Sequence, residues 1–88
     1  MTIKEFKFQY ALGVISEKDL ANIAITTSSE DILSVLAYND NWFVRYWVAI
    51  NSDTPTEVVA YLSDDENYTV KKAARKVLWE NKNDRKRI

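Results

Sequence analysis

The tetrapeptides Thr2-Ile3-Lys4-Glu5, Ser28-Ser29-Glu30-Asp31 and Thr54-Pro55-Thr56-Glu57 begin 26 residues apart along the chain. Each opens with a hydroxyl side chain and carries an acid three residues later. This pattern is typical of a helix start, because the hydroxyl and the acid each accept a hydrogen bond from a backbone N–H that the helix leaves unpaired. A period in this range is typical of stacked helical units. The spacing therefore predicts three copies of one helical unit.

Further helix-capping and helix-ending residues divide each unit into two helices. Gly13 is expected to end the first helix, because glycine adopts the left-handed C-cap conformation without strain. Ser16, Asn41 and Asn67 are expected N-caps of the second helix in each unit, and Pro55 is expected at the first position of a helix that Thr54 caps. The predicted helices cover about 3–12, 17–26, 29–38, 42–51, 55–63 and 68–80.

Composition favours one small packed domain. The chain has 88 residues, 47% of them hydrophobic, with a single Gly and a single Pro. We expect one domain over 1–88, with repeats at about 2–27, 28–53 and 54–80 and a basic, frayed tail at 81–88. No apolar run approaches the length that spans a bilayer, so we expect a soluble cytoplasmic protein with no membrane partner.

Residue types absent from the chain exclude several kinds of chemistry. There is no Cys and no His, which removes disulfides, Cys/His zinc sites, thiol nucleophiles and imidazole acid–base catalysis. The acidic groups Glu30-Asp31 and Asp64-Asp65-Glu66 lie at expected helix starts or turns, where acids stabilise the helix dipole without any chemistry. We therefore expect a protein that is not an enzyme and that uses no metal or other cofactor.

One stretch of the chain resembles a known family. The residues Leu36-Ala37, Val44 to Asn51, Thr54-Pro55-Thr56-Glu57-Val58-Val59 and Leu62 are similar to the repeat of the leucine-rich-variant proteins, which are relatives of HEAT and armadillo repeats. The resemblance implies a short right-handed α-solenoid of three αα-hairpin repeats, with the second helices lining the inner face. It also implies a scaffold or recognition role. The iron–sulfur cluster of some relatives is not carried over, because this chain has no cysteine.

The candidate binding residues share helical faces. Trp42, Arg45 and Tyr46 occur at i, i+3 and i+4 in one predicted helix, and a matching series with basic residues occurs in the last helix. Together they predict an aromatic and basic stripe that binds an acidic segment of a partner protein. Trp, Tyr and Arg are enriched at interface hot spots. The predicted partner-binding residues are Trp42, Arg45, Tyr46, Tyr68, Lys71, Lys72, Arg75 and Trp79.

Structural interpretations of the same residues remain open. Arg45 is equally well explained by an ion pair with Asp40, Asp64 or Asp65, and the lysines of the last helix by a solvated surface. Tyr46 is expected at the surface. Phe43 and Trp47 are expected to fill the core.

Charge distribution leaves two other functions open. Residues 1–70 hold eleven acids and four bases, whereas residues 71–88 hold eight bases and two acids. The basic last helix and tail make nucleic-acid binding the alternative function, although the acidic remainder would repel phosphates. The same asymmetry is compatible with a monomer or with weak head-to-tail homo-oligomers. A non-catalytic interaction module, adaptor or inhibitor remains our leading prediction.

Overall fold

The computed structural model describes the backbone of residues 1–86 and the side chains as far as Lys82. Within this range the chain forms six helices and no strand, which confirms the all-α prediction. The helices are α1 (Ile3–Leu12), α2 (Glu17–Thr26), α3 (Glu30–Leu36), α4 (Trp42–Ile50), α5 (Thr56–Leu62) and α6 (Tyr68–Lys86). None of them is long and apolar enough to cross a lipid bilayer.

Four of the predicted helix starts have the expected cap. In each, the side-chain oxygen of the capping residue accepts a hydrogen bond from a backbone N–H two or three residues later; the caps are Thr2, Ser16, Asn41 and Asn67. Gly13 ends α1 in the left-handed conformation, with φ of 71°, as predicted.

Helix α3 begins one residue later than predicted. Its N-cap is Ser29, whose Oγ accepts the Ile32 N–H at 3.2 Å, and not Ser28. The reason is the preceding turn, in which the Thr27 hydroxyl accepts the Ser29 N–H at 3.1 Å and brings Ser29 to the helix start.

The predicted cap of α5 is also wrong. The helix begins at Thr56, Pro55 occupies the N-cap position, and no side chain caps the end. Thr54 is buried instead, and its hydroxyl donates a 2.6 Å hydrogen bond to the Val48 carbonyl at the end of α4. The Thr54 hydroxyl points into the protein because the Val48 carbonyl needs a hydrogen-bond donor there, and leaving that carbonyl unpaired would destabilise the fold.

Helix α6 is longer than predicted. It continues to Lys86, so the expected end near Glu80 is wrong. Arg87 and Ile88 lie outside the described residues. The residues from Trp79 to Lys82 are exposed, so packing against other helices does not cover this part of α6.

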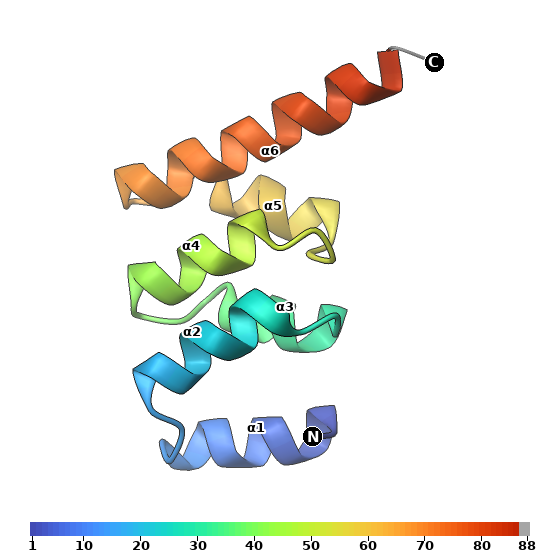
Figure 1. The fold of residues 1–88 in the computed structure, drawn as a ribbon. Coiled ribbons are helices and arrows are strands. Elements are labelled where there is room, and N and C mark those ends of the chain that lie inside the picture. The colour runs from blue at the N-terminus through green and yellow to red at the C-terminus, as the bar shows by residue number, and fades with distance from the viewer. Residues whose placement is uncertain (87–88) are drawn as a thin grey trace.

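The helices form two layers (Figure 1). α2 packs against α4 and α4 against α6, so these three lie side by side, while α1, α3 and α5 form the second layer. Each contact joins neighbours in the stack: α3 packs on α2 and α4, α5 packs on α4 and α6, and α1 packs on α3. The molecule is elongated, with principal extents of 44 × 26 × 17 Å.

Burial repeats every 26 residues in the last two units. The equivalent core positions have no solvent exposure in both units; they are Leu36 and Leu62, Val44 and Val70, and Val48 and Ala74. The turns repeat as well, since Asn39 Oδ1 accepts the Asn41 N–H and Asp65 Oδ1 accepts the Asn67 N–H, both at 2.8 Å. The two segments therefore share side-chain burial and backbone hydrogen bonding.

Polar side chains join successive units. Asn51, at the end of α4, donates from Nδ2 to the carbonyls of Ala24 and Thr27 at 2.8 and 2.9 Å, which ties α4 to the end of α2. Asn39 Nδ2 donates to the Tyr10 hydroxyl at 2.7 Å, which ties the α3–α4 turn to α1. The two bonds from Asn51 satisfy carbonyls that the end of α2 leaves unpaired.

Candidate functional site

The predicted binding residues divide between two sides of the molecule. Tyr46, Tyr68 and Lys72 line one shallow hollow between α4 and α6. Arg45 and Arg75 instead face the turns that precede α4 and α6, where they contact Asp65 and Asp64. The structure therefore does not place these residues in the single stripe that helical spacing predicted.

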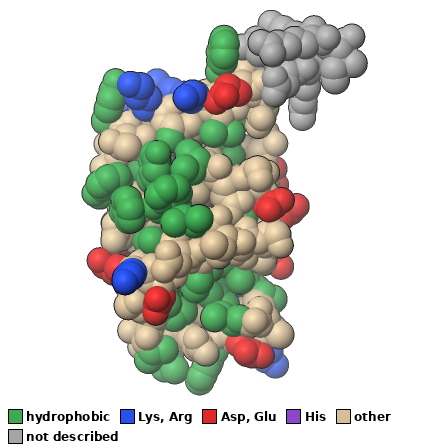
Figure 2. Space-filling model, viewed as in Figure 1, with side chains coloured by type: hydrophobic (Ala, Val, Ile, Leu, Met, Phe, Trp, Pro, Cys, Tyr) green, Lys and Arg blue, Asp and Glu red, His purple; other side chains and the backbone are tan. Residues whose placement is uncertain are grey.

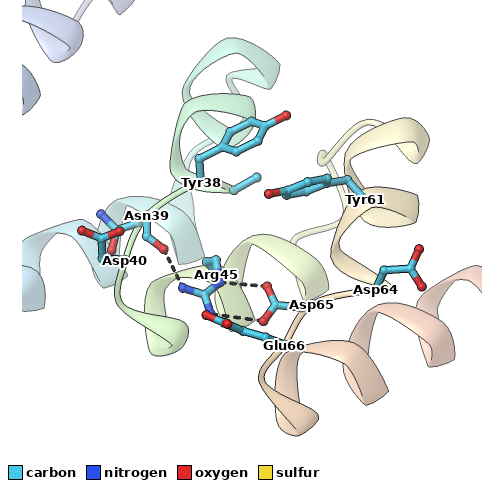
Figure 3. A pocket seen from close by; sticks show the side chains of 9 residues that line it. Tyr38, Asn39, Asp40, Arg45, Tyr61, Asp64, Asp65 and Glu66 are labelled. Carbon is cyan, nitrogen blue, oxygen red and sulfur yellow. Dashed lines mark hydrogen bonds and ion pairs between the residues drawn. The ribbon is translucent and has the colours of Figure 1, made fainter.

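Arg45 is a structural residue in the described fold. It is buried, with 8% of its surface exposed. Its Nε and Nη2 donate to the two carboxylate oxygens of Asp65 at 2.8 and 3.1 Å, and its Nη1 donates to the Asn39 carbonyl at 2.6 Å (Figure 3). The ion pair that was left open as an alternative is the one observed, and this bidentate geometry is the strong form of such pairs.

The pair shifts both ionisation equilibria. The hydrogen bonds that Arg45 donates to Asp65, opposed by burial, raise the pKa of Arg45 above its ordinary value. Burial alone would raise the pKa of Asp65, but hydrogen bonds from Arg45 and from the Asn67 N–H outweigh it, and the pKa of Asp65 is lowered. The charge of Lys71 adds to this lowering. Both groups stay charged at neutral pH.

Arg75 lies on the same side but at the surface. Its Nε donates to the Ser63 carbonyl at 3.0 Å, and its Nη2 lies 3.7 Å from Asp64 Oδ1. Both side chains are largely exposed, so this pair contributes little to stability.

A continuous aromatic face covers α4. It consists of Trp42, Phe43, Trp47 and Tyr46, whose rings meet edge to face in that order, with centroids 5.2 to 5.9 Å apart. Trp42 and Phe43 are exposed, whereas Tyr46 and Trp47 are half-buried and pack against the core. Figure 2 shows hydrophobic side chains gathered in the middle of this face, with basic side chains above them and mixed charges below.

Two expectations about this face need correction. Phe43 was expected in the core but is 44% exposed, because Val44 and Val48 fill the buried side of α4. Tyr46 was expected at the surface but is half-buried. The repeat could have indicated that Phe43 is exposed, because the equivalent position 26 residues later is the polar, exposed Thr69.

Shallow hollows flank the aromatic face on both sides. One, of about 340 Å³, lies between α4 and α6 and is lined by Tyr46, Tyr68, Thr69, Lys72, Ala73 and Lys76. The other, of about 400 Å³, lies between α2 and α4 and is lined by Glu17, Lys18, Ala21, Asn22, Ile25, Asn41, Phe43 and Trp47. A partner seated on the aromatic face would contact residues of three helices.

The charge beside the aromatic face comes from α6. Lys72 and Lys76 are exposed, and neither forms an ion pair with the side chains that the structure describes. The Lys72 Nζ lies 6.0 Å from the centre of the Tyr68 ring, at the outer limit of a cation–π contact. Trp79, farther along α6, is exposed and has no place in either hollow.

The described side chains offer no metal centre. Within this part of the chain, no group of three His, Cys, Asp or Glu side chains is arranged to hold a metal ion. The chemistry available on the aromatic face is burial of rings, cation–π contact and hydrogen bonding from lysine. Comparisons with protein-family models, curated protein sequences and solved structures gave no match to this chain.

Proposed function

We propose that this chain is a non-catalytic protein-interaction module that binds a partner protein through the aromatic face of α4 and the adjacent lysines of α6. The observation that carries the proposal is the aromatic face itself. Its four rings form one connected surface, and Trp42 and Phe43 remain exposed at 43% and 44%. Contiguous exposed aromatic surface is uncommon on proteins without a partner.

The proposed architecture is the short right-handed α-solenoid that the resemblance to leucine-rich-variant and HEAT-like repeats implies. Support comes from the packing of α2, α4 and α6 in one layer and from the 26-residue recurrence of buried positions such as Leu36 and Leu62. In such proteins stacked repeats present an extended binding surface. In the proposed solenoid, the second helices of three αα-hairpins form the binding face.

The proposed partner surface is apolar at its centre and acidic at one side. Apolar groups would cover the rings of α4, and carboxylates would reach Lys72 and Lys76 on α6. Such an arrangement follows the usual pattern of an interface, with aromatic anchors inside a polar rim. Arg45 has no part in it, because Asp65 and Asn39 already accept its hydrogen bonds.

Site-specific photo-crosslinking in the source cells tests the proposal. A photoreactive phenylalanine analogue at Phe43 and at Tyr68 should crosslink the same partner protein. The matched control is the analogue at Thr56, which is exposed on α5 in the other layer and should not crosslink that partner. Adding Lys72→Glu and Lys76→Glu should reduce the Phe43 crosslink by about tenfold, since two charge pairs are lost.

Three results would contradict the proposal. These are equal crosslinking from Thr56, a crosslink that ignores both lysine reversals, and crosslinking to nucleic acid in place of protein. The last result would favour the alternative function, nucleic-acid binding through α6 and the basic residues after it.

A further inference from the structure

A third hollow lies on the side of the molecule where the α3–α4 and α5–α6 turns meet. It has a volume of about 580 Å³, larger than either hollow beside the aromatic face. Its lining residues are Ala37, Tyr38, Asn39, Asp40, Arg45, Tyr61, Asp64, Asp65 and Glu66. We name it the tyrosine hollow, and it plays no part in the function proposed above.

Two exposed tyrosines form one wall of the tyrosine hollow. The Tyr38 and Tyr61 rings have centroids 4.7 Å apart and planes inclined by 41°, yet 68% and 50% of these residues remain exposed. In Figure 3 both rings lie on one side, and the Arg45–Asp65 pair and Glu66 lie opposite them. Tyrosine ring faces attract cations, and the exposed faces of this pair border the open space.

The charges around the hollow favour the same ligand class. Its lining holds four carboxylates and one guanidinium, that of Arg45. The Arg45 guanidinium already forms a bidentate ion pair with Asp65. Asp40 and Glu66 form no ion pair with the described side chains, whereas Asp64 lies 3.7 Å from Arg75. The surface that remains is therefore aromatic and negative.

The arrangement of the carboxylates around the hollow favours a cationic side chain over a metal ion as its ligand. Figure 3 shows Asp40 and Asp64 on opposite flanks with their carboxylates turned apart. Among the described residues, no three carboxylates converge as metal ligands. Spread carboxylates beside ring faces instead suit a planar cation, which stacks on an aromatic ring and donates hydrogen bonds at its edges.

We propose that the tyrosine hollow is a binding site for an arginine side chain on a basic segment of a protein. The guanidinium would stack on the Tyr38 or Tyr61 ring and donate to Glu66 and Asp40. The molecule would then carry two interaction surfaces of opposite preference, the aromatic face for an acidic partner surface and the tyrosine hollow for a basic one. Because the two use different residues, either proposal can fail without the other.

Nuclear magnetic resonance of tyrosine rings tests this proposal directly. The full chain, with ¹³C-labelled tyrosine, is titrated with a short peptide of alternating Arg and Ser. We expect saturable shifts of the Tyr38 and Tyr61 ring signals, and no such shifts with a matched Glu and Ser peptide. The double variant Asp40→Asn and Glu66→Gln keeps both rings, and it should weaken binding about fivefold to tenfold, because two favourable charge pairs are removed.

A control variant makes the same charge change elsewhere. Asp53→Asn and Glu57→Gln neutralise two exposed acids near the start of α5, outside the lining of the hollow, and should leave the affinity unchanged. Equal weakening in this control would overturn the proposal in favour of diffuse attraction between charges. Absence of ring shifts, shifts of the Trp42 and Trp47 signals in their place, or identical ring shifts with calcium ions or on concentrating the protein alone would overturn it as well.

Discussion

Arg45 connects three segments of the chain through one buried guanidinium. It extends from α4 to the Asp65 carboxylate in the α5–α6 turn and to the Asn39 carbonyl in the α3–α4 turn. A buried charge is tolerated only when its partners are in place. The residue therefore sets the relative position of two turns, and these two turns border the tyrosine hollow.

Replacing Asp65 tests this structural role. The Asp65→Asn variant leaves the Arg45 charge buried without a counterion, so the free energy of unfolding at neutral pH should fall by about 2–4 kcal/mol. Urea denaturation measures the change. The control Asp53→Asn, an exposed acid without an ion pair among the described residues, should change it by less than about 0.5 kcal/mol. Equal effects would contradict a structural role for Arg45.

The same pair predicts a pH dependence with a definite sign. The folded-state pKa of Asp65 is lowered, so the folded protein holds this proton less tightly than the unfolded chain. Its stabilisation is complete above the unfolded-state pKa and is lost as the pH falls through the lowered folded-state pKa. We expect the stability difference between wild type and Asp65→Asn to shrink in acid, as measured by urea denaturation at several pH values. A difference that grows on acidification would show that the sign is wrong.

At the scale of elements, the junction between α4 and α5 depends on Thr54. Its buried hydroxyl donates to the Val48 carbonyl and does not cap α5. Thr54→Val keeps the shape and removes the donor, which should lower the free energy of unfolding by about 1–2 kcal/mol. Thr54→Ser keeps the hydroxyl and serves as the matched control, with a smaller loss. If Ser were as damaging as Val in thermal denaturation, the hydrogen bond would not be the cause.

Helix α6 has two parts with different surroundings. Val70 and Ala74 are fully buried, and Val77 and Leu78 pack on the core, whereas the residues from Trp79 to Lys82 are all exposed. Helix without tertiary packing is only marginally stable. In hydrogen exchange, the amides of residues 81–82 should therefore exchange much faster than those of residues 74–78. Equal protection would indicate that something covers the distal part of α6, such as a second copy of the chain.

At the scale of the whole molecule, the principal contacts among the described residues join each helix to its neighbours in the stack. In such an arrangement, the stability of each helix depends mainly on its contacts with neighbouring helices. Phe6 anchors α1 at one end of the stack, while Val48 lies in the central helix α4. A defect at the end should therefore remain local, whereas a defect at the centre should affect both sides.

Hydrogen exchange on two core variants tests this neighbour coupling. Phe6→Ala should raise exchange in α1 and leave α6 amides unchanged, because α1 packs on α3 alone among the principal contacts. Val48→Ala removes two methyl groups from the centre and should destabilise all of α2, α4 and α6, by about 2 kcal/mol. Uniform loss of protection in both variants would indicate one fully cooperative unit and contradict the prediction.

Much of the fold was accessible from local sequence signals. Helix ends at Thr2, Gly13, Ser16 and Asn41 could be predicted because a cap acts within a few residues of itself. Core positions such as Leu36 and Leu62 could be predicted because one apolar stripe recurs with the repeat. The candidate site was less accessible, since spacing along one helix does not say which side faces a neighbouring turn.

Sequence by itself determined the helical class, the order of the six helices in residues 1–86 and the 26-residue recurrence, because these depend on caps and apolar spacing. Tertiary structure decided which side chains are free. It drew Thr54 to the Val48 carbonyl and paired Arg45 with Asp65, and it left Phe43 exposed because Val44 and Val48 already filled the core side of α4. The physical reason is that a side chain's partners and exposure depend on neighbouring helices, whose positions no local pattern specifies.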